Sequence, residues 1–206
     1  MKAWSLYHPF VLIDVPGASA PLVDQALCMA AREFCQRSGV WVEWSAPITA
    51  TPETNRYPFG LTADQELVRV VRAIRGSTEL RVLSYRDVPP DWIDPDSTEL
   101  VDSLVHLGGA EFLVFPKTTS ESIKLQLSFK PSILAASGGD VLFDSFAEEI
   151  ATGAKARLLM TRSTPFFDPQ MAGVHQMTFD RACSLAANAD FRQLSPGMRR
   201  VKKSAL

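Results

Sequence analysis

Residues 123–130 read Ile-Lys-Leu-Gln-Leu-Ser-Phe-Lys, an alternation of apolar and polar side chains. Successive side chains of a β-strand point to opposite faces, so this stretch predicts a strand with one buried face and one wet face. Residues 112–114, Phe-Leu-Val, precede it, and the polar loop 117–122 between them indicates that the two stretches form a hairpin. Residues 40–44, Val-Trp-Val-Glu-Trp, alternate in the same way and predict another strand.

The segment 66–75 fits two patterns. As a helix, it begins with a capping box formed by Thr62 and Gln65, and its apolar residues share one side. As a strand, its β-branched residues lead into a turn at Gly76–Ser77 and a second strand at 79–83. The pattern of residues alone slightly favours the helix.

Three helices are predicted on the two sides of this β-rich segment, at about residues 21–38, 140–161 and 169–190. Ser19 is suited to cap the start of the first helix, and Gly39 is suited to end it. An Asp-Pro pair opens the third helix, and the loop before it is short. The second and third helices are therefore expected to pack as an antiparallel αα-hairpin.

Two further local features follow from proline and glycine. Pro9 and Pro16 in the first residues of the chain predict an extended lead-in rather than a helix. Gly153 lies inside the second predicted helix, where glycine costs about 1 kcal/mol relative to alanine. It is therefore expected to mark the close approach of another backbone.

Composition excludes several classes of protein. The chain has 206 residues, of which 46% are hydrophobic and 21% charged, values that suit one folded domain. It has no apolar run long enough to span a bilayer, and its start does not resemble a secretion signal. Three cysteines without a C-x-x-C pair predict neither a disulfide framework nor a zinc site, which fits folding in a reducing cytosol.

Charge is divided unevenly along the chain. Residues 192–206 hold five basic residues and no acidic one, whereas residues 1–191 hold 16 basic and 23 acidic residues, a net charge of −7. An acidic body repels nucleic-acid phosphate, so the main surface is not expected to grip DNA or RNA. The basic tail is predicted to be a segment with a role separate from that of the acidic body.

No motif for nucleotide, metal or nucleophilic chemistry is present, and neither a cofactor nor a metal is expected. An enzyme site assembled from His175, Asp180 and Cys183 stays open as a minor alternative. His175 lies on the apolar side of its predicted helix, however, where a packed histidine is more common than a catalytic base.

Three stretches cover about half of the chain. They are His8-Pro-Phe-Val-Leu-Ile-Asp-Val-Pro-Gly17 with 21–27 and 30–35, then 123–132 leading to Leu142-Phe-Asp144, and finally 148–160 followed by Pro165-Phe-Phe-Asp-Pro169. In their order and spacing these stretches resemble the head–tail connector (adaptor) proteins of tailed bacteriophages. In such proteins the segment that matches 66–83 is a pair of strands. The resemblance therefore favours the strand interpretation there, against the local pattern.

The resemblance implies an α+β fold with a three-helix core, an inserted antiparallel β module and an extended C-terminal arm. Residues 1–191 would form a single connector domain, with the helical core at 19–39 and 140–191 and the β-rich insertion at 40–132. Residues 192–206 would form the basic arm. The stretch Trp92–Leu107 has no clear place in this scheme.

The resemblance also implies a structural, non-enzymatic virion protein at the head–tail junction, assembled in the host cytoplasm. It would form a homo-oligomeric ring of about 12 copies between the portal protein and a downstream tail or stopper protein, and double-stranded DNA would pass through it without specific binding. No membrane partner is expected. The residues expected to dock on the portal are Met198, Arg199, Arg200, Val201, Lys202 and Lys203. A tail-completion component that binds the tail tube is the alternative within the same class.

Overall fold

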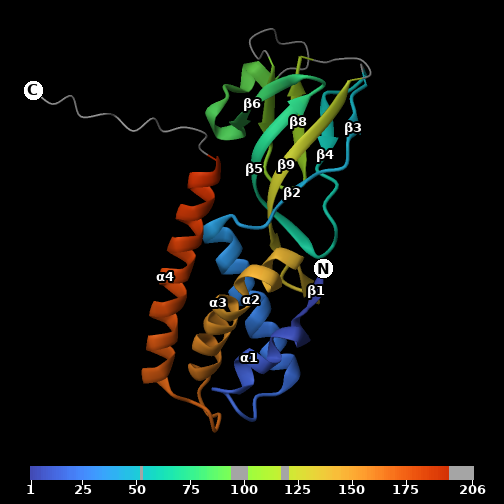
Figure 1. Ribbon diagram of the computed structural model, residues 1–206. Coiled ribbons are helices and arrows are strands. Elements are labelled where there is room, and N and C mark those ends of the chain that lie inside the picture. Colours follow the sequence, from blue (N-terminus) through green and yellow to red (C-terminus); the bar gives the residue numbers. More distant parts are fainter. Residues whose placement is uncertain (52, 94–101, 117–120, 195–206) are drawn as a thin grey trace, which may run out of the picture.

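The α-helices and the larger β-sheet occupy opposite ends of the molecule in the computed structural model, which describes residues 1–51, 53–93, 102–116 and 121–194 (Figure 1). The fold is α+β, with four α-helices and a curled mixed sheet. The helices are α1 (His8–Leu12), α2 (Ala20–Ser38), α3 (Asp140–Leu159) and α4 (Pro169–Leu194). The sequence predicted three of them, and α1 is the addition.

The larger sheet has the strand order β2-β9-β5-β6-β7-β8-β4, and β3 also pairs with β9. Its strands are β2 (Val42–Trp44), β3 (Ile48–Thr49), β4 (Arg56–Pro58), β5 (Gln65–Arg75), β6 (Thr78–Ser84), β7 (Ser103–His106), β8 (Glu111–Phe115) and β9 (Ser122–Pro131). A separate two-stranded ribbon joins β1 (Lys2–Ala3) to β10 (Ser137–Gly138).

The amphipathic strand predicted at 123–129 is confirmed as the core of β9, and its four apolar side chains are buried. Both of its edges are occupied, because β5 pairs along one edge while β2 and β3 pair along the other. The predicted hairpin with residues 112–114 is therefore wrong. Those residues belong to β8, which pairs with β7 and β4 instead.

The segment 66–75 is a strand, β5, and two irregularities in its pairing explain why it resembles a helix. The register against β9 shifts between Leu67 and Arg69 and again between Val70 and Arg72. Each shift inserts one extra residue, as a β-bulge does. The residues opposite the buried positions of β9 are therefore Leu67, Val70 and Ala73, and this three-residue step imitates helical spacing.

The β module is mixed rather than purely antiparallel. Strand β6, which contains the predicted strand 79–83, forms an antiparallel hairpin with β5 but pairs in parallel with β7. Parallel neighbours need a long connection between them, and residues 85–102 provide it. Within the unassigned stretch Trp92–Leu107, the structure thus contains β7.

The local signals at the helix ends mark the boundaries of α2 and α4 well. Ser19 occupies the N-cap position of α2 without a side-chain hydrogen bond, and Gly39 ends that helix in the left-handed conformation, at φ 72°. At the start of α4, Asp168 Oδ1 accepts hydrogen bonds from the backbone N–H groups of Gln170 and Met171, both at 3.0 Å. Helix α3 is kinked at Phe146, whose φ is −139°.

The prediction of an extended lead-in is wrong, because the first residues after β1 form a 3₁₀ helix (Trp4–Tyr7) followed by α1. Burial of aromatic rings explains the difference. Trp4 and Tyr7 are both buried, and the indole Nε1 of Trp4 donates a hydrogen bond of 2.7 Å to the carbonyl oxygen of Ala135. Pro9 lies in the first turn of α1, where its missing N–H costs nothing.

Two expectations about the C-terminal half also change. Gly153 meets the buried ring of Phe179 rather than another backbone, because a Cβ at Gly153 would lie 2.6 Å from a ring carbon. Helix α4 continues to Leu194, so residues 192–194 are helical and do not belong to an extended arm. Residues 195–206 lie outside the described part of the chain.

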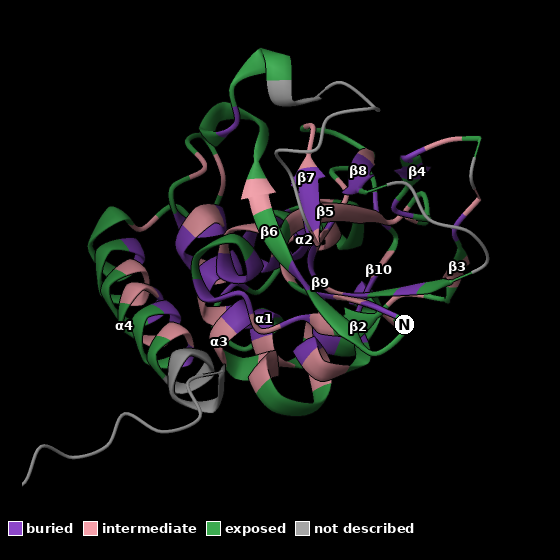
Figure 2. Ribbon diagram, turned by 90° about the horizontal axis from the view of Figure 1, so that it is seen from above, coloured by how far each residue is buried: buried purple, intermediate pink, exposed green. Residues whose placement is uncertain are grey.

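One continuous hydrophobic core joins the two ends of the molecule. It contains residues of α2, α3, α4, β5 and β9, and Figure 2 shows buried residues gathered where these elements meet. A second, smaller cluster formed by Val88, Val105, Leu113 and Phe115 lies within the β module. Among the described residues, no helix has the length and apolarity needed to cross a membrane.

The contact between Gly153 and Phe179 gives a direct test of the helix packing. We expect Gly153→Ala to lower the free energy of unfolding by about 1–2 kcal/mol, because overpacking outweighs the better helix propensity of alanine. The matched control is Gly173→Ala in α4, where a new Cβ meets nothing within 4 Å and should stabilise by about 0.5–1 kcal/mol. Urea unfolding measures both, and a stabilised G153A protein would contradict the packing described here.

Candidate interaction surfaces

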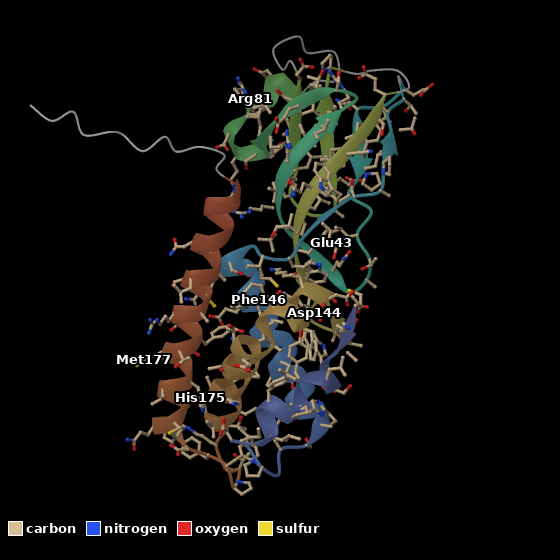
Figure 3. All side chains as sticks on the ribbon, viewed as in Figure 1. Glu43, Arg81, Asp144, Phe146, His175 and Met177 are labelled. Atoms are coloured by element: carbon tan, nitrogen blue, oxygen red, sulfur yellow. The ribbon has the colours of Figure 1, made fainter. Side chains whose placement is uncertain are left out.

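Helix α4 exposes an apolar face to solvent. Met171, Val174, Met177 and Leu185 lie on the side of α4 that points away from α2 and α3, with Met177 75% and Leu185 60% exposed. Figure 3 shows Met177 projecting outward from α4. Arg181 is the one charged side chain among the exposed positions from Pro169 to Asn188. We call these five residues the outer face of α4.

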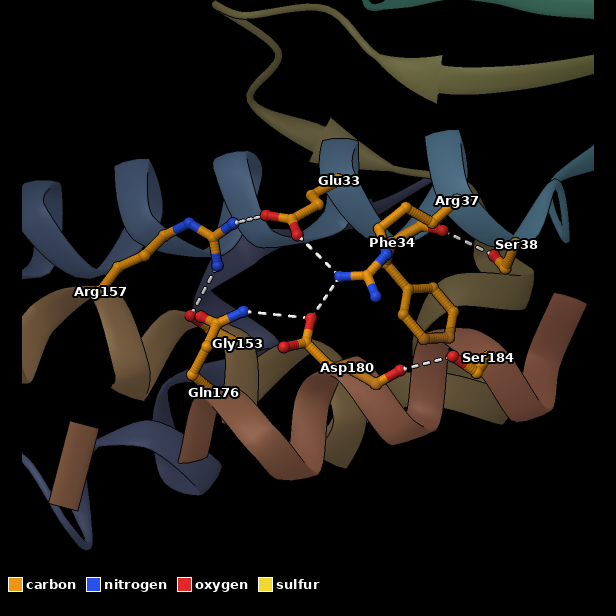
Figure 4. A network of polar contacts seen from close by, with 9 residues as sticks. All are labelled: Glu33, Phe34, Arg37, Ser38, Gly153, Arg157, Gln176, Asp180 and Ser184. Atoms are coloured by element: carbon orange, nitrogen blue, oxygen red, sulfur yellow. Dashed lines mark hydrogen bonds and ion pairs between the residues drawn. The ribbon is translucent and has the colours of Figure 1, made fainter. Parts of the chain in front are cut away.

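The opposite side of α4 is held to α2 and α3 by a cluster of charged groups (Figure 4). The guanidinium of Arg37 in α2 bridges Asp180 of α4 and Glu33 of α2, and Arg157 of α3 binds the second oxygen of Glu33. The amide of Gln176 donates a further hydrogen bond to Asp180 at 3.3 Å. Together with the packed ring of Phe179, these bonds fix the rotation of α4 and hence which residues face the solvent.

A second apolar feature lies in the turn between β9 and β10. Ile133 and Leu134 are 63% and 90% exposed there. The turn is anchored from behind by the Ala135 carbonyl, which accepts from Trp4, and by the Ser132 carbonyl, which accepts from the thiol of Cys28 at 3.3 Å. We call Ile133 and Leu134 the apolar turn. Because its backbone is tied to α2 and to the N-terminal segment, the two side chains project from a fixed base.

A cavity of about 370 Å³ lies at the foot of the helices, near the α3–α4 loop. Its apolar lining includes Leu159, Phe166 and Met171, and its polar lining includes Asp14 and His175. Met171 also belongs to the outer face of α4, so the cavity and that face are continuous. Lys155 pairs with Asp14 at 2.6 Å, and this bond holds the pKa of the Asp14 carboxyl below its usual range.

The three residues considered for an enzyme site all lie on α4, where Asp180 and Cys183 are one turn apart and His175 lies nearer the start of the helix. Cys183 is buried against α2, and burial raises the pKa of its thiol to about 11. The carboxylate of Asp180 is engaged by Arg37, which lowers its pKa. His175 lines the cavity, where burial first and Lys155 second lower its pKa. The thiol of Cys183 is therefore protonated at neutral pH, and the charged groups around it, Arg37, Glu33 and Asp180, are already paired with one another.

The buried cysteines of α2 resemble Cys183 in this respect. Burial raises the pKa values of Cys28 and Cys35, and all three thiols are free. Within the described residues, no group of His, Cys, Asp and Glu side chains is placed to hold a metal ion.

The residues expected to dock on the portal, Met198–Lys203, lie outside the described residues. The two apolar surfaces were missed at the level of sequence. A signal for the first existed, because Val174, Met177 and Leu185 lie on the side of the predicted helix away from its apolar stripe. Ile133 and Leu134 gave no such signal, since two apolar residues in a short turn can equally be buried.

Comparison with known proteins identifies a family. The family model described as SU10 adaptor protein matches residues 10–201, which is nearly the whole chain. No curated protein matches the chain. The resemblance to phage head–tail adaptors inferred from the three sequence stretches is thereby confirmed.

The charged cluster behind α4 makes stability depend on pH in a specific way. We expect Asp180→Asn to lower the free energy of unfolding at pH 7 by at most about 0.5–1 kcal/mol, because the carboxylate is 45% exposed and its ion pair with Arg37 is partly screened. Since the pKa of Asp180 is lowered from 3.8, this stabilisation is present above pH 4 and disappears as the pH falls through the lowered value.

The difference between wild type and D180N should therefore close below about pH 4, as followed by chemical denaturation at several pH values. The matched control is Asp144→Asn on the exposed side of α3, whose carboxylate has no ion pair within the described residues. Equal losses in D180N and D144N at pH 7 would contradict a specific role for the cluster.

Proposed function

Because this chain belongs to the SU10 adaptor protein family of phage head–tail adaptors, we propose that it is a ring-forming connector subunit between the portal and the tail. Family membership makes the chain a structural virion protein at the head–tail junction. The match over residues 10–201 carries the proposal. The proposal has three further parts: residues 1–191 act as one connector domain, about 12 copies close a ring, and assembly takes place in the host cytoplasm.

The charge arrangement of the body supports passage of DNA without binding. Residues 1–191 carry a net charge of −7. Many of their basic groups are also neutralised within the subunit, through the ion pairs Arg32–Glu66, Arg56–Glu111, Arg72–Glu79, Arg75–Asp102 and Lys155–Asp14. Cations that are already paired release few counterions from DNA phosphates. Double-stranded DNA would therefore slide past such a surface.

The basic C-terminal arm is the proposed portal-docking element. It begins after Leu194, so α4 acts as a rigid stem whose position is fixed by Arg37 and Asp180. Arg199, Arg200, Lys202 and Lys203 supply four positive charges, and Met198 and Val201 supply apolar contacts between them. A segment of this kind can become ordered on an acidic protein surface when it binds.

The proposal includes no catalytic activity. Structural adaptors act by binding, and of the candidate residues Asp180 is paired with Arg37, Cys183 is buried and His175 lines the cavity. One experiment distinguishes a portal connector from the alternative function, a tail-completion protein that binds the tail tube. Pull-down of the subunit with isolated portal protein, and separately with isolated tail-tube protein, shows which of the two retains it.

Deletion of residues 195–206 tests the docking arm without touching a described element. We expect the truncated protein to keep the melting temperature of the wild type and to lose attachment to portal particles, as judged by co-sedimentation and negative-stain imaging. A second variant replaces Arg199, Arg200, Lys202 and Lys203 by glutamine and should weaken attachment at least tenfold at low salt. If the truncated subunit attaches to portals as well as wild type, the arm is not the docking element.

A further inference from the structure

Two exposed apolar surfaces lie on different sides of the subunit. The outer face of α4 forms one side, and the apolar turn belongs to the connection that enters β10, the partner of β1. Figures 1 and 2 both place α4 on one flank of the molecule and the β1–β10 ribbon on the other, with α2 and α3 between them. In Figure 1, β1 lies at a level along the long axis that α4 also spans.

The shapes of the two surfaces are complementary. The outer face of α4 is a row along one helix, and the positions of Val174, Met177 and Leu185 let an apolar group lie between successive turns. The apolar turn is a narrow projection whose tip, Leu134, is 90% exposed. A side chain that inserts between the side chains of a facing helix makes close contact of the knobs-into-holes kind.

Charge is complementary as well. Arg181, at the centre of the outer face of α4, has no ion-pair partner within the described residues. Beside the apolar turn, the backbone N–H of Ser132 donates a 2.8 Å hydrogen bond to the carbonyl oxygen of Asp64. Asp64 likewise has no ion pair within the part of the chain that is described, and the cations Arg32 and Lys130 both bind Glu66 instead.

We propose that the outer face of α4 in one subunit packs against the apolar turn of a second copy, with Arg181 facing Asp64 across the contact. In an assembled ring, the outer face of α4 on each subunit would contact the apolar turn of one neighbour, and its own apolar turn would contact the α4 face of the other neighbour. This inference rests on the proposed ring and adds the residues that close it. Because the two surfaces differ, the contact is heterologous and can repeat from copy to copy until a ring closes.

Such a contact also explains how the described charges support assembly. The cluster of Arg37, Glu33 and Asp180 fixes the rotation of α4, and the anchoring of Ala135 and Ser132 fixes the turn. Both surfaces are therefore formed before the subunits meet, and little ordering is needed on association.

The first experiment uses Met177→Glu and Leu134→Glu, each of which removes one surface and leaves the other intact. Circular dichroism checks that both variants fold, which their exposed positions favour. Assembly is measured by sedimentation velocity and negative-stain imaging, with and without portal protein purified from the same virus. We expect wild-type subunits to form rings and each variant alone to remain monomeric.

Mixing the two variants is the decisive step. The intact turn of M177E can dock on the intact α4 face of L134E, but neither damaged surface can continue the chain. An equimolar mixture should therefore give dimers and no rings. Ile13→Glu is the matched control, since Ile13 is 78% exposed but belongs to neither surface, and it should assemble like wild type.

A charge exchange tests the polar part of the contact. Arg181→Glu and Asp64→Arg should each weaken association roughly tenfold, and the double variant should recover to within about threefold of wild type. Recovery in the double variant cannot arise from a general loss of folding.

The outcomes separate this inference from the proposed function. If wild type forms rings and M177E and L134E form them equally well, or if their mixture stays monomeric, the ring stands and this contact is wrong. If wild type forms no ring even with portal protein, the proposed function fails and the inference fails with it.

Discussion

The alternation of side chains along β9 is the constraint on which the rest of the structure depends. Ile123, Leu125, Leu127 and Phe129 all face the core, and a slip of one residue in the pairing would turn the whole set toward solvent and bury lysines in its place. Both edges of β9 carry other strands, and its inner face packs against α2. The register of one strand therefore positions the sheet and the helices together.

The junction between the two ends of the molecule is built on the same strand. The hydroxyl of Ser128 in β9 donates to the carbonyl oxygen of Gly39, where α2 ends, and Trp41 packs edge-on against Phe129. A hydrogen bond and an aromatic contact thus lock the helix end onto the strand. The helical end and the sheet consequently share one core and one set of contacts, which suits a protein that acts by shape and contact.

Rigidity is extended to the outermost helix by electrostatics as well as by packing. Phe179 fills the space that Gly153 leaves open, and the ion pairs of Arg37 and Arg157 with Glu33 and Asp180 lie beside it. Exposed ion pairs of this kind add little stability individually. They do select one rotation of α4, and through it which residues the helix presents to solvent.

Helices α2, α3 and α4 and the strand β9 follow from residue order alone, because capping residues and a repeating apolar pattern act over a few neighbouring positions. The pairing of strands does not follow from residue order, because β8 can pair with any strand that has a free edge and both edges of β9 are already occupied. The three-residue spacing of apolar residues in β5 resembles a helix in the sequence, but it arises from the two bulges in its pairing with β9. The lead-in is helical because this conformation buries Trp4, whose indole binds the Ala135 carbonyl, together with Tyr7.

For the candidate surfaces too, some features follow from the residue order and others from the tertiary structure. The charge division and the family likeness are properties of the residue order, because they depend on which residues are present and in what sequence. The positions of Met177 and Leu134 depend instead on the three-dimensional packing. Packing exposes Met177 to solvent, places Leu134 in a turn and puts the two residues on opposite flanks. Exposure is what remains after the core has formed, and packing contacts between residues far apart in the chain, such as Cys28 with Ser132 and Arg37 with Asp180, determine it.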